Sequence, residues 1–446
     1  TEKADMRKAM IYLQKYGIST KLAAKIYQYY GMKVYKVLEE NPYQLADNIE
    51  GIGFKTADEI ASKIGIHTDS DYRIRSGLFY TLQQAVGEGH VYLPQNILLR
   101  RANALLGVDL EDIEKFIMDL CIERKTVMKE VDEEIRIYPA HYYYLELNTA
   151  KMLNDLDIDC QMPEDMMEKR LKREEQKEKI ELDPMQHRAV IEAIKHGLLI
   201  LTGGPGTGKT FTTNLVIRFL KNRGKKILLA APTGRAAKRM EESTGMSSQT
   251  IHRLLEYGRD DIGNIGFQRN ENNPLETDTV IIDESSMIDQ SLMYALLKAI
   301  PKNCQLILVG DKNQLPSVGA GRILADIIAA DICPVIELKK IYRQSEESYI
   351  AEAAHGILEG KVPYPWGKDK KIKDFYFIPV DYSDKEKAAT VISEYAGKKV
   401  PAFANNDVQV LTMTRVRATG CQELNEKIKE ITNPSDRSKR EYKNLR

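Results

Sequence analysis

Leu-Leu-Ile-Leu-Thr-Gly-Gly-Pro-Gly-Thr-Gly-Lys-Thr, residues 198–210, is the stretch that decides the fold. Apolar and β-branched residues run directly into a glycine-rich turn, and Lys209-Thr210 opens an apolar helical segment that ends near Leu220. Strand, glycine loop and helix in this order are the context of a phosphate-binding P-loop. Glycines let the backbone wrap closely around a polyphosphate, and N–H groups at the helix start direct their dipoles at it. The sequence therefore predicts a nucleoside triphosphate site; a plain tight turn is the less favoured alternative.

The residues of this loop have separate predicted tasks. Lys209 supplies a positive charge for the β- and γ-phosphates of ATP, and the Thr210 hydroxyl is placed to hold Mg²⁺. Gln186, shortly before the strand, can form paired hydrogen bonds with the adenine edge. The predicted ATP-binding residues in this part of the chain are Gln186, Gly204, Pro205, Gly206, Thr207, Gly208, Lys209, Thr210 and Phe211.

Two carboxylates follow a second buried-strand pattern, Thr279 to Ile282. Ligands in open α/β sheets lie at the carboxyl ends of the strands. We therefore predict that Asp283 holds Mg²⁺ through water and that Glu284 is the general base; helix capping is the alternative. Gln314, after a further strand pattern, is placed to sense the γ-phosphate. Arg343 is a candidate arginine finger, with an ordinary surface arginine as the alternative.

Polar turns after two strand patterns predict contacts with a nucleic acid strand. Pro232-Thr233-Gly234-Arg235 opens a helix, whose first N–H groups favour a phosphate. His252, within Thr250 to Leu254, belongs to a second cluster of the same kind. A simple cap or loop is an equally weighted alternative for each cluster. Residues 257–273 are polar and punctuated by glycines, which predicts an exposed β-hairpin.

Residues 1–70 have the pattern of short helices joined by glycine turns. Gly51-Ile52-Gly53 lies between two such helices, and Tyr16 to Ser19 forms a similar turn. Helix, hairpin and helix in tandem predict backbone N–H groups that hold a DNA phosphate without reading bases, with Lys55 adding a charge. An ordinary helical pair is the alternative. Within residues 71–165, the apolar pattern predicts helices at 74–86 and 110–122 and a β-hairpin at 126–138. The highly charged residues 166–181 are expected to form a linking helix.

The overall composition limits which partners, metal sites and cellular locations are compatible with the chain. The chain has 446 residues, 43% hydrophobic and 29% charged, with 65 basic and 65 acidic side chains, so any nucleic-acid surface is a local stripe. Five scattered cysteines favour reduced thiols and argue against a disulfide framework or a zinc site. No long apolar run or signal peptide is visible. We predict a soluble, cytoplasmic, monomeric protein without a membrane partner.

The ordered motifs resemble those of a superfamily 1 DNA helicase. Gly310 to Gly319, Ile341 to Gln344 and Ala353 to Leu358 are similar to the RecD branch, the exonuclease V alpha-subunit family. The front end resembles RecD-like helicases that carry an N-terminal helix-hairpin-helix extension and act without RecB and RecC. The resemblance implies ATP- and Mg²⁺-driven 5′ to 3′ movement on single-stranded DNA and at single-strand/duplex junctions. It also implies a strand-splitting pin at 257–273 and packing of Tyr342 against adenine.

The expected fold is α/β: a RecA-like P-loop motor domain with a parallel sheet, a partial second motor domain and an α-rich N-terminal region. The predicted domains are a tandem helix-hairpin-helix region at 1–70, a winged-helix-like region at 71–165 and a linking helix at 166–181. The first motor domain is predicted at 182–335 and a C-terminally truncated second one at 336–446, because the family continues into an SH3-like insert and two further motifs.

For that second domain we expect one strand, Val408 to Thr412, and one helix, Gln422 to Glu430. We also expect the 446-residue chain to bind ATP–Mg²⁺ but to hydrolyse ATP poorly. A P-loop ATPase switch that binds nucleic acid without translocating, and a DNA-binding module with an inert motor, remain alternatives. RNA as the substrate also stays open, because contacts to the 2′-OH cannot be identified from the motifs.

Overall fold

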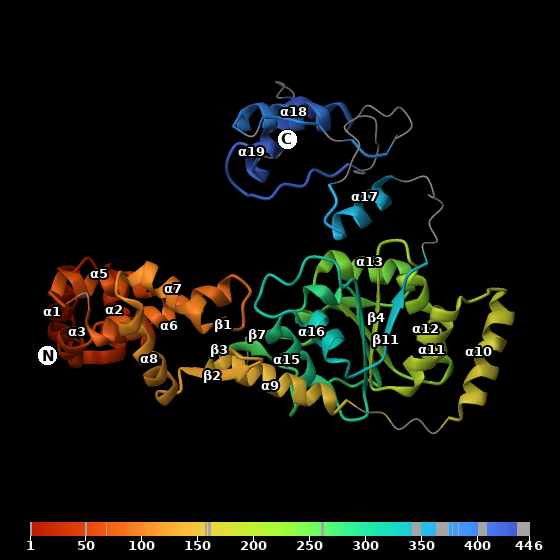
Figure 1. Cartoon of the computed structure of the whole chain (residues 1–446), viewed down its shortest axis with the longest axis horizontal. Helices are drawn as coiled ribbons and strands as arrows, with labels where there is room; N and C mark the ends of the chain where they lie inside the picture. The colour runs from red at the N-terminus through yellow and green to blue at the C-terminus, as the bar shows by residue number, and fades with distance from the viewer. Residues whose placement is uncertain are drawn as a thin grey trace. The chain divides into compact units, whose positions relative to one another are not determined.

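The structure, a computed structural model, describes residues 2–49, 51–67, 69–156, 158, 162–259, 263–340, 349–362, 374–376, 378–381, 383–399 and 408–434. The chain forms two compact units, Thr1–Arg343 and Gln344–Arg446. The first unit contains an α-rich N-terminal region and a domain built on a parallel sheet (Figure 1).

Six strands form that sheet in the order β11-β4-β10-β9-β5-β6, and every neighbouring pair is parallel. The P-loop strand β4 therefore lies between β10 and β11, and all six of its residues are buried. Their bounds are β4 (Leu198–Gly203), β5 (Ile227–Ala231), β6 (Ser248–Thr250), β9 (Thr279–Ile282), β10 (Gln305–Gly310) and β11 (Val335–Leu338). The predicted α/β class with a parallel P-loop sheet is confirmed.

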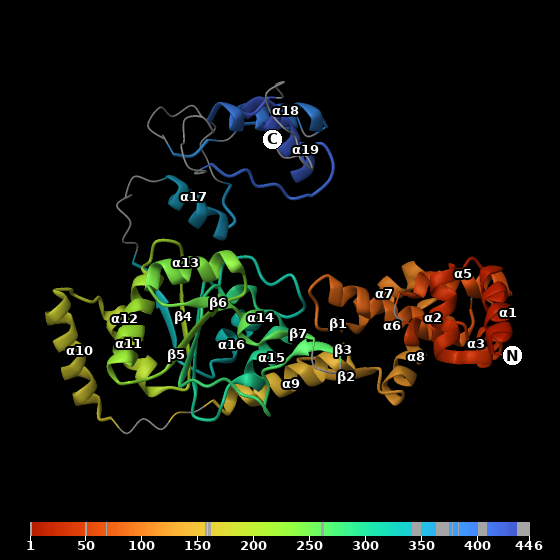
Figure 2. The same ribbon diagram turned by 180° about the vertical axis from the view of Figure 1, so that it is seen from behind.

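Helices cover both faces of the sheet, which explains why its strands are continuously apolar. Leu198 and Ile200 of β4 face one hydrophobic core, whereas Leu199 and Leu201 face another. The first core is closed by α9 (Ala140–Asn154), α15 (Gln290–Ala299) and α16 (Ile323–Ala330), the second by α10 (Glu164–Glu178), α11 (Pro184–Lys195), α12 (Lys209–Asn222) and α13 (Gly234–Thr244). Figure 2 shows α11 and α12 across the sheet from α15 and α16.

The N-terminal helices share a third hydrophobic core, which extends from Ala9 to Ile137. Its first part contains α1 (Glu2–Gln14), α2 (Thr20–Tyr30), η1 (Gly31–Lys33), α3 (Val34–Glu40), α4 (Gln44–Asn48) and α5 (Phe54–Ile64). The core contains side chains from both predicted helix-hairpin-helix turns, such as Ile18 and Ile52. Apolar residues at the turns thus anchor them, and the glycines beside them stay at the surface.

Three helices and a small antiparallel sheet follow, in the region predicted to be winged-helix-like. They are α6 (Asp71–Gly87), β1 (Leu93–Pro94), α7 (Gln95–Leu106), α8 (Leu110–Ile122), β2 (Thr126–Val131) and β3 (Glu134–Pro139). The β-hairpin predicted at 126–138 is confirmed, with β2 paired to β3. Asp132 and Glu133 form its turn with φ of 51° and 63°, because a two-residue hairpin loop needs left-handed backbone.

The second unit contains α17 (Tyr349–Leu358), α18 (Lys385–Lys399) and α19 (Cys421–Thr432). An ion pair from Lys427 to Glu386 (3.0 Å) joins α18 and α19. Helix α19 corresponds to the helix predicted at Gln422 to Glu430. The strand predicted at Val408 to Thr412 is wrong: the structure gives these residues no strand conformation. A strand exists only through its pairing, and the described residues of this unit include no other strand.

No helix in the described part of the chain is both long and apolar enough to cross a bilayer.

Candidate nucleotide site and nucleic-acid interface

The P-loop turns sharply between β4 and α12. Gly206 and Gly208 have φ of 80° and 87°, a left-handed conformation that glycine adopts without strain. At Gly203, a Cβ atom would lie 2.6 Å from the Leu338 carbonyl oxygen and 2.7 Å from Thr207 Oγ1. Thr207 Oγ1 itself donates a hydrogen bond to the Gly204 carbonyl (2.9 Å). The glycine positions of the motif are therefore required by backbone geometry and by packing against β11.

The lysine of the motif lies over this loop. Lys209 Nζ donates to the carbonyl oxygens of Gly203 (2.5 Å) and Gly204 (3.0 Å). Thr210 and Phe211 are exposed in the first turn of α12, where the helix N–H groups are unpaired within the helix. A cation, a hydroxyl and free backbone donors thus gather at one helix start, which is what a phosphate needs.

The two carboxylates lie at the carboxyl end of β9. Asp283 Oδ1 accepts a hydrogen bond from the Glu284 N–H (2.8 Å). Burial raises the pKa of both carboxyl groups, and the negative charge of Asp283 raises that of Glu284 further. The positive charges of Lys209 and Arg239 lower both pKa values. The P-loop lysine and the carboxylate pair therefore act on one another, as a shared site requires.

The backbone at Glu284 is strained. Its φ and ψ are 52° and 40°, the left-handed region that non-glycine residues avoid. Ser285 Oγ donates to the Val309 carbonyl (2.9 Å), and a Cβ atom at Gly310 would lie 2.6 Å from that Oγ. The ends of β9 and β10 are thus fixed to each other. This packing holds the Glu284 backbone in a conformation that non-glycine residues rarely adopt.

Gln314 lies in the loop that follows β10. The Lys312 N–H donates to Thr202 Oγ1 in β4 (3.2 Å), and the Gln314 N–H donates to the carbonyl of the buried Asp311 (3.1 Å). The loop therefore leaves the sheet beside the P-loop strand. That position agrees with the predicted role of Gln314 in sensing the γ-phosphate.

Gln186 is buried at the start of α11, with 3% of its surface exposed. Its Oε1 accepts from the Asp183 N–H (3.2 Å), and the Asp183 carboxylate accepts from the Gln186 N–H (3.0 Å). This reciprocal capping box occupies the side-chain oxygen, so the helix start uses Gln186 structurally. Its contact with adenine stays a prediction.

Arg239 acts electrostatically on the carboxylate pair, and the sequence analysis assigned it no role. It lies in α13, one helical turn after Arg235, and its charge acts on Asp283 and Glu284. The signal was its four-residue spacing from the arginine of the Thr-Gly-Arg turn. By contrast, the predicted Tyr342 and Arg343 lie outside the described residues.

The two polar turns predicted to contact nucleic acid both cap helices. Thr233 Oγ1 accepts from the Ala236 N–H (3.3 Å) at the start of α13, between Pro232 and the exposed Arg235. Thr250 Oγ1 accepts from the Arg253 N–H (3.2 Å) at the start of α14 (Ile251–Leu254). Capping and phosphate binding are compatible, because a capped turn still presents further N–H groups.

The predicted exposed hairpin is confirmed by the antiparallel pairing of β7 (Tyr257–Arg259) with β8 (Ile265–Phe267). Tyr257 and Ile265 are 53% and 63% exposed, respectively. The His252 ring packs against the rings of Tyr257 (5.7 Å) and Phe267 (5.6 Å). His252 therefore supports the base of the hairpin, which links one predicted nucleic-acid residue to the predicted pin.

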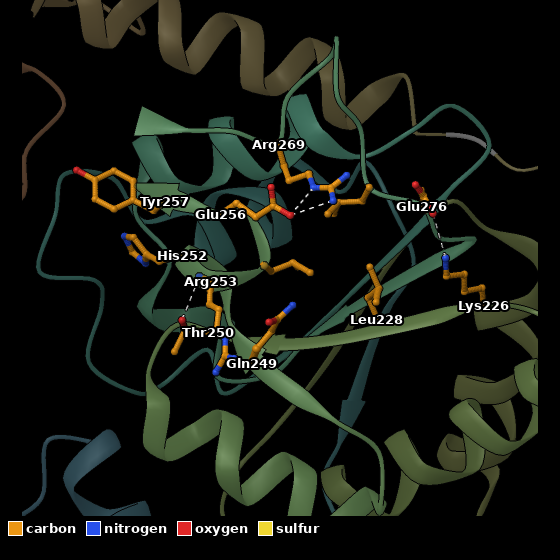
Figure 3. A pocket seen from close by; sticks show the side chains of 12 residues that line it. Lys226, Leu228, Gln249, Thr250, His252, Arg253, Glu256, Tyr257, Arg269 and Glu276 are labelled. Atoms are coloured by element: carbon orange, nitrogen blue, oxygen red, sulfur yellow. Dashed lines mark hydrogen bonds and ion pairs between the residues drawn. The ribbon is translucent and has the colours of Figure 1, made fainter. Parts of the chain in front are cut away.

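A cavity of about 770 Å³ lies beside this hairpin base, along β5 and β6 (Figure 3). Arg269 pairs with Glu256 (2.9 Å) and Lys226 pairs with Glu276 (3.7 Å) on its walls. Gln249 and Arg253 line it as well; Arg253 belongs to the predicted cluster Thr250 to Leu254, whereas the sequence analysis assigned Gln249 no role. The P-loop and the carboxylate pair do not line this cavity, so it is a separate feature of the domain.

The N-terminal hairpin presents its backbone to solvent. Gly51 has φ of 98°, and Gly53 precedes the first turn of α5. Both are exposed, and a Cβ atom at Gly53 would meet nothing within 4 Å. Lys55 is exposed in the first turn of the same helix. In the other hairpin, the Tyr16 carbonyl accepts a hydrogen bond from Lys63 Nζ (3.0 Å), which joins that turn to the last turn of α5.

The sheet and its glycine loop define the class: a P-loop nucleoside triphosphatase domain. Residues 186–320 match the family model described as an AAA domain, and residues 2–92 match that of the ATP-dependent RecD2 DNA helicase HHH domain. Together with the relatives below, these matches confirm the predicted resemblance of the chain to RecD-like superfamily 1 helicases with an N-terminal helix-hairpin-helix region.

The ATP-dependent RecD2 DNA helicase of Deinococcus radiodurans is 32% identical over 456 residues, covering 96% of this chain and 59% of that protein. The RecBCD enzyme subunit RecD of Mycolicibacterium smegmatis is 38% identical over 185 residues, or 36% of this chain and 33% of that protein. The chain thus spans three fifths or less of these relatives. The Pif1 helicase from Candida albicans aligns over 52% of this chain and 59% of that chain, with 22% identity and a TM-score of 0.34, a likeness too low to carry an argument.

Proposed function

We propose that the protein is an ATP-dependent 5′ to 3′ DNA helicase of the cytoplasm that acts as a monomer on single-stranded DNA and single-strand/duplex junctions. The observation that carries this proposal is the joint placement of three features on one domain. The P-loop lysine, the carboxylate pair and the exposed hairpin all belong to the sheet formed by β4, β5, β9 and β10 and to its connections.

ATP hydrolysis is assigned to side chains around the carboxyl end of that sheet. Lys209 and the first N–H groups of α12 bind the β- and γ-phosphates, and Thr210 and Asp283 are the residues that would hold Mg²⁺. A hydroxyl and one carboxylate suit this ion, which is usually bound by one or two carboxylates together with substrate phosphates. Bound Mg²⁺ neutralises charge on the phosphates. Glu284 accepts the proton of the attacking water, and Gln314 senses the γ-phosphate.

Nucleic acid contacts are assigned to three surfaces. Pro232, Thr233 and Arg235 face one strand at the start of α13, and the hairpin supported by His252 separates the strands. Gly51, Gly53 and Lys55 bind a phosphate without reading bases. In this proposal Tyr342 packs on adenine and Arg343 reaches the γ-phosphate. DNA is favoured over RNA because the helix-hairpin-helix match is to a DNA helicase domain.

The test is steady-state ATP hydrolysis by the natural protein that carries this sequence, with oligo-dT of increasing length, beside unwinding of duplexes with a 5′ or a 3′ tail. A translocating enzyme hydrolyses ATP faster as the strand lengthens and unwinds only the 5′-tailed duplex. Hydrolysis that is independent of strand length, without unwinding, would instead support a nucleic-acid-binding ATPase switch. A parallel series with RNA tails decides between the two nucleic acids.

A further inference from the structure

Gln290 is a buried polar residue that neither the sequence motifs nor the proposed reaction uses. It is the first residue of α15 and only 2% of its surface is exposed. Its backbone N–H donates to the Ala320 carbonyl (2.9 Å), and its side-chain Nε2 donates to Thr149 Oγ1 (2.8 Å). Thr149 lies in α9 and is itself 3% exposed. One residue therefore joins α9 to the loop that carries Gln314.

The far end of this loop, residues 317–321, fits closely against the start of α15. Ser317 Oγ hydrogen-bonds the carbonyls of Gly319 (3.0 Å) and Gly321 (2.8 Å). Gly321 has φ of 105°, and a Cβ atom there would lie 3.0 Å from Gln290 Cβ. A Cβ atom at Gly319 would overlap the Asp289 carboxylate. Residues 319–321 therefore lie in close contact with Asp289 and Gln290.

A second hydrogen bond connects the same loop to the N-terminal region. The Gly321 N–H donates to the Gly89 carbonyl (3.2 Å), in the segment between α6 and β1. Figures 1 and 2 both draw α9, the helix that continues from that region onto the core of the parallel sheet, alongside α15. Two links, Thr149 to Gln290 and Gly89 to Gly321, thus converge on one end of the loop. Its other end is fixed beside the P-loop strand by the bond from Lys312 to Thr202.

We propose that Gln290 is a positioning residue that joins the γ-phosphate-sensing loop to the N-terminal region, so that nucleotide bound at the P-loop changes the mobility of that region. The inference rests on the proposed nucleotide site and on Gln314 as its sensor. Breaking a buried hydrogen bond leaves polar groups without partners, which is costly. A displacement of the loop at Gln314 is therefore passed on through Gln290 and Gly321. Coupling requires two sites that bias one shared element, and in this proposal that element is the loop from Asp311 to Gly321.

The experiment is hydrogen–deuterium exchange on the full chain, with and without Mg²⁺ and a non-hydrolysable ATP analogue. In the wild-type protein, peptides at 203–210 become protected, and peptides at 86–93 and 145–153 change their exchange by about fivefold or more, the low end of ordinary coupling between sites. Thr149→Val, which removes only the hydroxyl, abolishes the change at 86–93 and 145–153 but keeps the protection at 203–210. Thr149→Ser keeps both, and Gln290→Met, of similar volume, repeats the result of Thr149→Val.

The matched control is Thr279→Val. Thr279 is also buried, 1% exposed, and its Oγ1 bonds Gln305 Oε1 (3.5 Å) inside the motor domain. This variant makes the same chemical change at a buried threonine with a longer hydrogen bond, and we expect it to transmit the change normally. Unchanged exchange at 86–93 and 145–153 in a wild-type protein with a protected P-loop would overturn the inference. So would normal transmission in Thr149→Val, or its loss in Thr279→Val. An unprotected P-loop in the wild-type protein would refute the nucleotide site itself, a separate result.

Discussion

At the scale of single residues, the ionisation of the carboxylate pair, Asp283 and Glu284, depends on the positive charge of Lys209. Burial makes ionisation of Asp283 and Glu284 unfavourable, and two cations reduce that cost. Partial burial strengthens such interactions relative to those between fully exposed charges. Changes of single charges should therefore alter turnover while leaving the fold intact.

Lys209→Ala is expected to abolish most ATP turnover, because it removes the cation aimed at the phosphates. Losses of about 10²–10³-fold or more are typical for such electrostatic groups. Glu284→Gln is expected to retain ATP binding and to lose hydrolysis, since only the base changes. Both are measured by steady-state hydrolysis beside calorimetric titration with a non-hydrolysable analogue. Turnover within about threefold of wild type in either variant contradicts the assignment.

Arg239→Ala is expected to lower turnover, because Asp283 and Glu284 lose a charge that stabilises their ionised forms. We expect a decrease of about tenfold, corresponding to about 1.4 kcal/mol of transition-state stabilisation. Arg239→Lys keeps the charge and should restore most of the rate. Lys238→Ala is the matched control, because Lys238 is the neighbouring cation and pairs with Glu242 (3.8 Å) at the surface. Equal losses in Arg239→Ala and Lys238→Ala would rule out a specific role.

At the scale of elements, the hairpin of β7 and β8 is separable from the ATP site. It is an insertion between β6 and β9, and its base rests on His252 and on the ion pair from Arg269 to Glu256. The strands of the sheet keep their own pairing without it. Its removal should therefore affect only what the hairpin itself contacts.

Replacing residues 257–273 by a two-residue turn is expected to spare DNA-stimulated ATP hydrolysis and to stop duplex unwinding. The physical reason is that the hairpin separates strands, whereas hydrolysis depends on the carboxyl ends of β4 and β9. The measurement pairs an ATPase assay on oligo-dT with unwinding of a 5′-tailed duplex, in the natural protein. If hydrolysis disappears together with unwinding, the hairpin is a structural part of the motor domain instead.

At the scale of the whole molecule, the first unit contains separate hydrophobic cores. One belongs to the N-terminal region and two lie on the faces of the parallel sheet. A ligand of the P-loop stabilises the domain that binds it, by an amount set by mass action. Nucleotide should therefore raise the unfolding temperature of the motor domain.

With the Mg²⁺-bound analogue at about 100 times its dissociation constant, we expect about 2.7 kcal/mol of added stability for the transition that includes the sheet. Differential scanning calorimetry of the full chain measures it. Lys209→Ala is the control, since its weakened phosphate binding should reduce the shift at the same analogue concentration. An undiminished shift in Lys209→Ala would place the bound nucleotide elsewhere.

The sequence by itself determined the P-loop, the buried strands that lead into it and into Asp283, and several helices, such as those predicted at 74–86 and 110–122. Local patterns are sufficient there, because buried parallel strands are continuously apolar and because left-handed turns select glycine, as at Gly206 and Gly208. The hairpins at 126–138 and 257–273 were predictable for the same reason. The strand expected at Val408 to Thr412 failed, because apolar residues form a strand only when a neighbour pairs with them.

Only the tertiary structure decided which distant residues meet. It brought Arg239 of α13 into the electrostatic field of Asp283 and Glu284, and it gave the side chain of Gln186 a capping role at its own helix start. It also joined Gln290 to Thr149, 141 residues apart in the chain. Such contacts depend on how helices pack across a sheet. No local pattern contains that information, because helix and strand periodicities specify which face is buried but not its partner.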